Sequence, residues 1–202
     1  MKIKALLYCC KAKPYLYPHF HNLYFTKNKD FGNVKLNGKI VAECDFEVEE
    51  IIYNHVGNPL DDFYGMQLLT KTLKESEILQ HSKLKFNELR KYLLRNEDDY
   101  ISPLEVGHAI HIKNLNIFDK PKELNEVYKI EDVGGMLFTK PLTKAPQNMM
   151  RVSVNHWDYA TYNPDDIRIL ISIQSQWMCL ILNHIKDVEV RRVVLKEMLN
   201  NE

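Results

Sequence analysis

The segment HIKDVEVRR, residues 184–192, carries the residues whose types and spacing best suit chemistry. Its two valines alternate with charged residues, which predicts a β-strand. Asp187, Glu189 and Arg191 would then share one face, and the valines would face the core. A carboxylate and a guanidinium in one row can bind the edge of a base, and Lys186 beside them can act on a reactive carbonyl. The same row is typical of a surface charge ladder, and residue types alone favour that ladder.

A second group of candidates lies in residues 1–39, which hold eight lysines and one acid among aromatic side chains. Ammonium groups can meet phosphates while rings stack on bases, so this segment suits single-stranded nucleic acid. Lys11 and Lys13 are the candidates to guide phosphate. The alternative is a solvated, Lys-rich strand edge that discourages aggregation. His19 and His21 would share a strand face, but no third ligand is in view, so we predict no metal site.

The bulk composition limits the class of protein. A chain of 202 residues with 45% hydrophobic content suits a single domain over residues 1–202. Its 27 basic and 27 acidic side chains give no net charge, which argues against non-specific binding of duplex DNA. Four cysteines without a CxxC pair indicate buried thiols in a reducing compartment, and no apolar run is long enough to span a membrane. We therefore expect a cytoplasmic protein, without a cofactor.

The elements that must position these residues are mostly strands. Residues 66–94 show helical periodicity, with a break expected at residues 80–82. Residues 155–166 are polar and turn-rich and indicate a linker, after which a strand, a helix and a strand are expected. This order predicts an α+β domain, most simply a closed or partly closed barrel. Further strands are expected over residues 3–10, 39–51, 108–118 and 149–154.

Three segments resemble the ASCH family of the PUA-like superfamily, whose fold is a small β-barrel. They are LNGKIVAECDFEVEEI (36–51), GHAIHIKNLNIFDKPKELNEVY (107–128) and LTKAPQNMMRV (142–152), in the family's own order. The second is the most specific match. The resemblance implies a PUA-like barrel with a helical insertion at residues 66–95.

The family's usual amino-terminal motif is similar to the far end of this chain, ISIQSQWMCLILNHIKDVEVRR (171–192). Lys186, Glu189 and Arg191 match the motif's Lys, Glu and Arg. We interpret this order as a circular permutation, in which residues 167–202 are the relocated motif and residues 155–166 join the ancestral ends. A truncated domain followed by the start of a second one would be the alternative.

The resemblance also implies a ligand and a site. In the family this strand lines the central cleft, so we expect an RNA- or modified-nucleotide-binding module. Lys186, Glu189 and Arg191 would line the cleft, with Gln147 and Asn148 opposite. Other residues that the matched motifs bring to the site are Gln174, in place of a motif lysine, and Trp177, as a stacking surface.

Two alternatives differ in class. One is an enzyme, either an amidohydrolase acting on an acylated nucleoside such as N4-acetylcytidine or a ribonuclease-like protein. Lys186 would polarise the bond and Glu189 would act as acid or base, although Glu189 stands where related amidohydrolases have a nucleophilic Thr. The other is a protein-interaction domain that uses the helical insertion, and it requires an exposed apolar stripe there. Exchange of the carboxy-terminal strand between two copies is a further arrangement compatible with the permutation.

Overall fold

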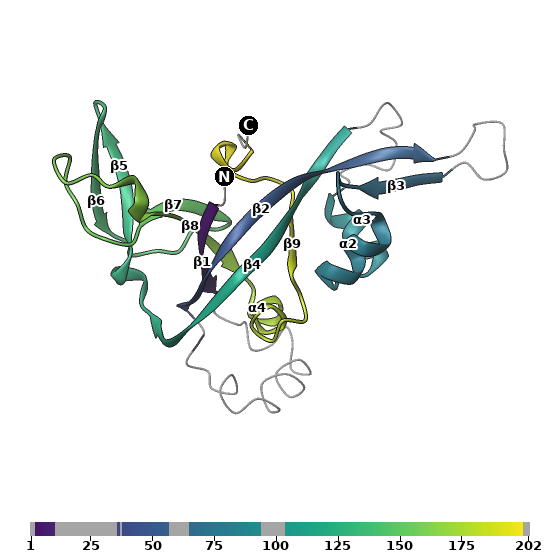
Figure 1. Ribbon diagram of the computed structural model, residues 1–202, viewed down its shortest axis with the longest axis horizontal. Coiled ribbons are helices and arrows are strands. Elements are labelled where there is room, and N and C mark those ends of the chain that lie inside the picture. The colour runs from purple at the N-terminus through teal and green to yellow at the C-terminus, as the bar shows by residue number, and fades with distance from the viewer. Residues whose placement is uncertain (1–2, 11–35, 37, 57–64, 94–103, 200–202) are drawn as a thin grey trace. The chain divides into compact units, whose positions relative to one another are not determined.

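The computed structural model describes residues 3–10, 36, 38–56, 65–93 and 104–199. In these residues the fold is mixed α+β and strands dominate it, which confirms the predicted class at that level (Figure 1). The α-helices of the described residues are α2 (Glu75–Ser82), α3 (Phe86–Leu93) and α4 (Ser175–Leu182). None of them is long and apolar enough to cross a membrane.

The strands join in one sheet with the order β6-β5-β7-β8-β1-β2-β4-β9, and β3 pairs with β2. The described residues divide into two compact units, which are considered separately below. Unit 1 comprises Met1–Phe46 and Lys113–His184, and unit 2 comprises Glu47–Ile112 and Ile185–Glu202. The strands are β1 (Ile3–Cys9), β2 (Lys39–Val56), β3 (Gly65–Leu69), β4 (Leu104–Lys122), β5 (Tyr128–Val133), β6 (Met136–Pro141), β7 (Met149–Ser153), β8 (Ile167–Ile173) and β9 (Val188–Arg191).

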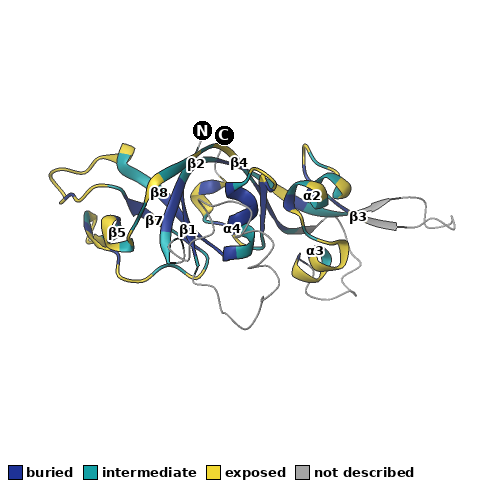
Figure 2. Cartoon of the chain, turned by 90° about the horizontal axis from the view of Figure 1, so that it is seen from below, coloured by how far each residue is buried: buried dark blue, intermediate teal, exposed yellow. Residues whose placement is uncertain are grey.

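In unit 1, β1 lies between two other strands. It pairs antiparallel with β2 and parallel with β8, where Ala5 is opposite Ile169. Every residue from Ala5 to Cys9 is buried, so most of β1 is dark blue in Figure 2. Burial on both faces explains why this strand is a continuous apolar run, as the sequence predicted.

The segment expected as a linker, residues 155–166, is anchored to unit 1. Trp157 in this segment is only 2% exposed. Its indole Nε1 donates to Ser153 Oγ at 2.7 Å, and its backbone nitrogen donates to Thr139 Oγ1 at 2.8 Å. Trp157 is therefore a packing residue of the β6–β7 region and offers no stacking surface to a ligand.

Unit 2 contains the helical insertion. Helices α2 and α3 share one apolar core with β9 and parts of β2, β3 and β4. The predicted break is confirmed, because α2 ends at Ser82 and Lys83 follows with a left-handed backbone at φ 59°. The buried residues of this core are Ile51, Leu68, Ile78, Leu89, Leu93, Ala109, Val188 and Val190.

One expectation for secondary structure was wrong. Residues 66–69 were expected as helix, but they belong to β3, where Leu69 is opposite Ile52 of β2. Pairing with a neighbouring strand overrides the local helical periodicity there. The hairpin of β5 and β6 was not among the predicted strands, and its turn lies at Gly134–Gly135, where both φ angles are positive.

Candidate functional site

Three charged side chains around β9 form a chain of contacts inside unit 2. Lys186 Nζ lies 3.3 Å from Glu189 Oε2, and Arg191 Nη2 lies 3.0 Å from Glu189 Oε1. The exposed fractions of the side chains are 2% for Lys186, 8% for Glu189 and 16% for Arg191. One carboxylate thus bridges two cations, and Arg191 is the member that has most contact with solvent. We call these three residues the β9 charge chain.

The strand pairing explains how the β9 charge chain is positioned. β9 runs antiparallel to β4, with Glu189 opposite Ile110 and Arg191 opposite His108. Directly opposite residues share a face of the sheet, so Glu189, Arg191 and the buried His108 lie on one face. The two valines of β9 point into the unit 2 core, as the alternation predicted.

The prediction of a surface charge ladder, which residue types alone favoured, is wrong. Glu189 is 6% exposed and Lys186 is 3% exposed, and of the four charged positions from 186 to 191 only Asp187 is exposed. A buried ion pair behaves unlike a surface pair, because removing either partner leaves an uncompensated charge in a low-dielectric environment. The sequence-predicted site residues on β9 are therefore brought together by the fold.

Lys186 also has a role that the sequence did not reveal. Its Nζ donates to the backbone carbonyl of Ser82 at 2.7 Å, at the carboxy-terminal end of α2. The last carbonyls of a helix lack partners within the helix and carry partial negative charge, so a cation stabilises them. Burial lowers the pKa of Lys186, although Glu189 opposes this shift, and Arg191 lowers the pKa further.

A second cation of the same segment caps the other helix. Arg192 donates through Nε to the carbonyl of Tyr92 at 3.1 Å, and its Nη2 donates to the same oxygen. The guanidinium also lies 5.6 Å from the centre of the Tyr92 ring. His81 Nδ1 lies 2.8 Å from Asp187 Oδ1, which adds a further contact between α2 and the segment before β9. No local pattern predicts these contacts, because each joins residues about 100 positions apart in the chain.

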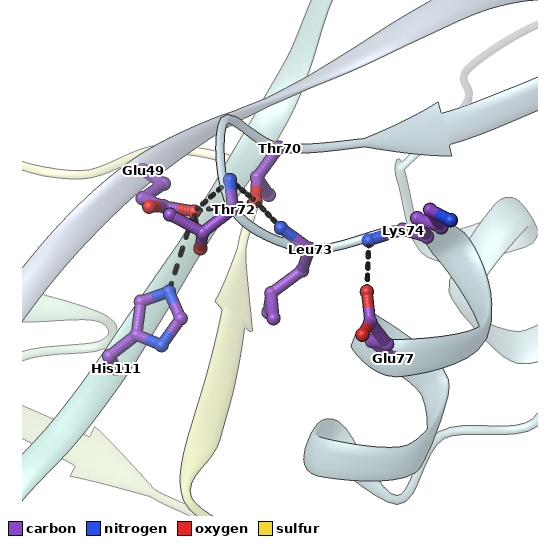
Figure 3. Close-up of polar contacts among 7 residues, drawn as sticks. All are labelled: Glu49, Thr70, Thr72, Leu73, Lys74, Glu77 and His111. Carbon is purple, nitrogen blue, oxygen red and sulfur yellow. Dashed lines mark hydrogen bonds and ion pairs between the residues drawn. The ribbon is translucent and has the colours of Figure 1, made fainter.

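A separate polar cluster surrounds Glu49 at the edge of the unit 2 core (Figure 3). Glu49 Oε2 accepts hydrogen bonds from Thr70 Oγ1 at 2.5 Å and Thr72 Oγ1 at 2.8 Å. His111 Nε2 lies 3.5 Å from the same oxygen. Burial alone would raise the pKa of Glu49, but the two threonine hydrogen bonds and His111 outweigh it and lower the pKa.

This Glu49 cluster is poorly suited to nucleophilic catalysis. Both threonine hydroxyls donate to the Glu49 carboxylate, but the lowered pKa of Glu49 makes that carboxylate a weak base for taking their protons. Thr70 Oγ1 also accepts from the backbone nitrogens of Thr72 and Leu73, so it fixes the turn between β3 and α2. In the part of the chain that the structure describes, no three His, Cys, Asp or Glu side chains cluster as metal ligands would.

The other predicted site residues lie in unit 1. Gln147 is exposed, and the carbonyl of the half-buried Asn148 accepts from the Ser172 nitrogen at 2.9 Å. Gln174 is exposed at the start of α4, where its Oε1 accepts from Gln176 Nε2. The arrangement of these residues opposite the β9 charge chain stays a prediction. Trp177 is half-buried on α4, and Lys11, Lys13, His19 and His21 lie outside the described residues.

The β9 charge chain can bind an anion or the polar edge of a base, because a fixed guanidinium presents paired donors to either. The Lys186 amine is hydrogen-bonded to Ser82 and paired with Glu189, so a reaction at this amine would first have to displace those partners. The chain matches no protein-family model, no curated protein and no solved structure.

Proposed function

We propose that the protein is an RNA- or modified-nucleotide-binding module in which Arg191 contacts the ligand. Glu189 orients the guanidinium, and Lys186 holds Glu189. The observation that carries this proposal is the geometry of the β9 charge chain, in which Glu189 lies 3.0 Å from Arg191 while the Arg191 side chain remains 16% exposed. A guanidinium that is held by a carboxylate and still reaches solvent can donate to an anion or to the edge of a base.

The energetics of burial support this proposal. Taking charged groups out of water costs several kcal/mol for each ion, and well-packed apolar residues are often as stable as a buried ion pair. Charged groups that are held at such a cost are frequent at functional sites. A guanidinium forms two parallel hydrogen bonds with a phosphate or with a base edge, which suits both proposed ligands.

The finer fold is part of the same proposal: a circularly permuted ASCH barrel of the PUA-like type. The parallel pairing of β1 with β8 supports it, because it brings the first strand beside the first strand of the relocated motif. The order of β8, α4 and β9 is the strand, helix and strand of that motif. The free state of all four cysteines agrees with the proposed cytoplasmic location.

A thermal-shift screen against nucleosides, including N4-acetylcytidine, and short single-stranded RNAs tests the binding proposal. A ligand at about 100 times its Kd stabilises the folded state by about 2.7 kcal/mol, which is a shift of several degrees in Tm. Arg191→Gln should abolish the shift, whereas Lys196→Gln, at an exposed position of unit 2, should keep it. A ligand that shifts the wild type and Arg191→Gln equally would contradict the proposed contact.

A nucleoside amidohydrolase or ribonuclease-like enzyme is the second candidate, and the contact between Lys186 and Glu189 at 3.3 Å favours it. This function requires a lysine that polarises the bond beside a carboxylate that acts as acid or base. Incubation of N4-acetylcytidine and RNA with the protein, followed by mass analysis, tests this function. Product that disappears in Lys186→Met would establish the enzyme, and unchanged substrate would exclude it for these compounds.

The described part of the helical insertion does not favour the protein-interaction alternative. The apolar side chains that α2 and α3 share with the unit 2 core are buried, and the large exposed ones on the helices are the aromatic residues Phe86 and Tyr92. Arg90 lies 4.3 Å from the centre of the Phe86 ring, and Arg192 lies near Tyr92. Two separate rings beside arginines do not form the apolar stripe that this alternative requires.

A further inference from the structure

We infer that Lys186 and Arg192 form a latch that holds α2 and α3 against β9, and that an anion bound at Arg191 tightens this latch. The inference rests on the proposed function for its second half only. Lys186 contacts the end of α2 through the Ser82 carbonyl, and Arg192 contacts the end of α3 through the Tyr92 carbonyl. The ends of both helices are thus bound by cations from one segment of seven residues.

The length of the helices explains why a latch matters. α2 and α3 have eight residues each, and isolated helices shorter than about 12 residues are marginal in water. Their stability must therefore come from packing and from their ends. Ile78 of α2 and Leu93 of α3 supply the packing in the unit 2 core, and the two cations neutralise the carbonyl ends.

Close approach of the chain at Gly107 reinforces the α3 end of the latch. A Cβ added at Gly107 would lie 2.5 Å from Leu93 Cδ2 and 2.9 Å from the carbonyl oxygen of Arg191. Only a glycine lets β4, β9 and the last turn of α3 come this close. Close packing at Gly107 therefore supports the latch in addition to the hydrogen bonds.

The link to the ligand runs through Glu189. Its Oε2 lies near Lys186 and its Oε1 near Arg191, so a continuous chain of contacts joins the Ser82 carbonyl to Arg191. Arg191 repels the Lys186 cation, and a bound anion would cancel that repulsion. The Lys186 ammonium, and with it the cap on α2, becomes more stable when Arg191 is occupied. By thermodynamic reciprocity, release of the α2 cap must weaken the anion's binding by the same factor.

Hydrogen–deuterium exchange of the full chain tests the latch without a ligand. Loss of one cap should raise exchange of the affected helix at least tenfold. We expect this change in α2 for Lys186→Met and in α3 for Arg192→Gln, while β5 and β6 of unit 1 exchange as in the wild type. Lys71→Met and Lys196→Met, at exposed positions, are the matched controls. Equal exchange in Arg192→Gln and the controls would overturn the latch even if Lys186→Met failed to fold.

The same exchange experiment with a ten-nucleotide oligouridylate, and separately with inorganic phosphate, tests the coupling. A saturating probe should slow exchange of both helices about threefold or more in the wild type and leave Lys186→Met unchanged. A response to phosphate alone would assign the effect to a simple anion, and a response to oligouridylate alone would assign it to RNA. If a probe binds and the helices exchange as before, the coupling is overturned. If neither probe binds, the proposed function and the coupling both fail, and the latch stands on the first measurement.

Discussion

Replacing Lys186 by methionine removes a buried cation while keeping the length of the side chain. Two groups lose their partner at once. The Ser82 carbonyl, 2.7 Å from the ammonium, loses a hydrogen bond. Of the two partners of Glu189 described above, only Arg191 remains. The backbone carbonyl alone accounts for about 1–3 kcal/mol if it stays unsatisfied. Breaking a buried ion pair costs about 3–5 kcal/mol in total.

The free energy of unfolding should therefore fall by roughly 3 kcal/mol in Lys186→Met, at the lower end of that range. The lower end is expected because burial already disfavours the Lys186 cation, as its lowered pKa shows. Urea denaturation measures this change as a shift of the unfolding midpoint, with the dependence of the unfolding free energy on urea concentration unchanged.

A double-mutant cycle separates the interaction energy of Lys186 with Glu189 from the other effects of replacing each side chain. Glu189→Gln removes the charge from the other partner, and the two substitutions together should cost less than the sum by about 1 kcal/mol or more. Lys196→Met should stay within about 0.5 kcal/mol of the wild type, since Lys196 is exposed. A Lys186→Met variant as stable as Lys196→Met would refute the reasoning that the β9 charge chain is a buried, coupled unit.

Three further predictions concern stability. Gly107→Ala should destabilise the protein by about 1–3 kcal/mol in urea, because the added Cβ meets the backbone of β9, and shortening Leu93 as well should not restore stability. Burial raises the pKa of the Cys9 thiol from 9.0 to about 12. The stabilisation that this shift gives the folded state is therefore present below pH 9 and is lost as the pH rises toward 12. In thermal unfolding, Cys9→Ala should lose less stability than the wild type over this alkaline range. The pKa of Glu49 is lowered from 4.5, so the stabilisation by its carboxylate is present above pH 4.5 and is lost as the pH falls through the folded-state pKa. Glu49→Gln should therefore flatten the curve of stability against pH on the acid side. An unchanged curve would contradict the role of the Thr70 and Thr72 hydrogen bonds.

Strands with a clear apolar pattern could be predicted from the sequence. β1, β7 and β8 lie where apolar runs or alternation predicted them, because a buried strand face requires apolar residues at regular positions. β5 and β6 could not be predicted as strands. Their exposed face carries Lys129, Glu131 and Lys140, so a charged, half-exposed hairpin shows no apolar periodicity.

The β9 residues illustrate what a sequence reveals about a site and what it does not. Alternation placed Glu189 and Arg191 on one face, and the structure confirms that face. Their burial depends on elements distant in the chain, so local pattern could not predict it. The contact of Lys186 with the end of α2 joins positions 104 residues apart, and without it the lysine resembles any surface cation.

Arginine side-chain NMR during a titration tests the central claim most directly. The Nε–H resonance of Arg191 is assigned as the one missing from Arg191→Gln, and oligouridylate or the best ligand of the thermal screen is added to the wild type. The account predicts that this resonance shifts in proportion to occupancy and that the Arg151 resonance, from an exposed side chain of unit 1, stays in place. Saturable binding that leaves the Arg191 resonance unmoved would contradict the account.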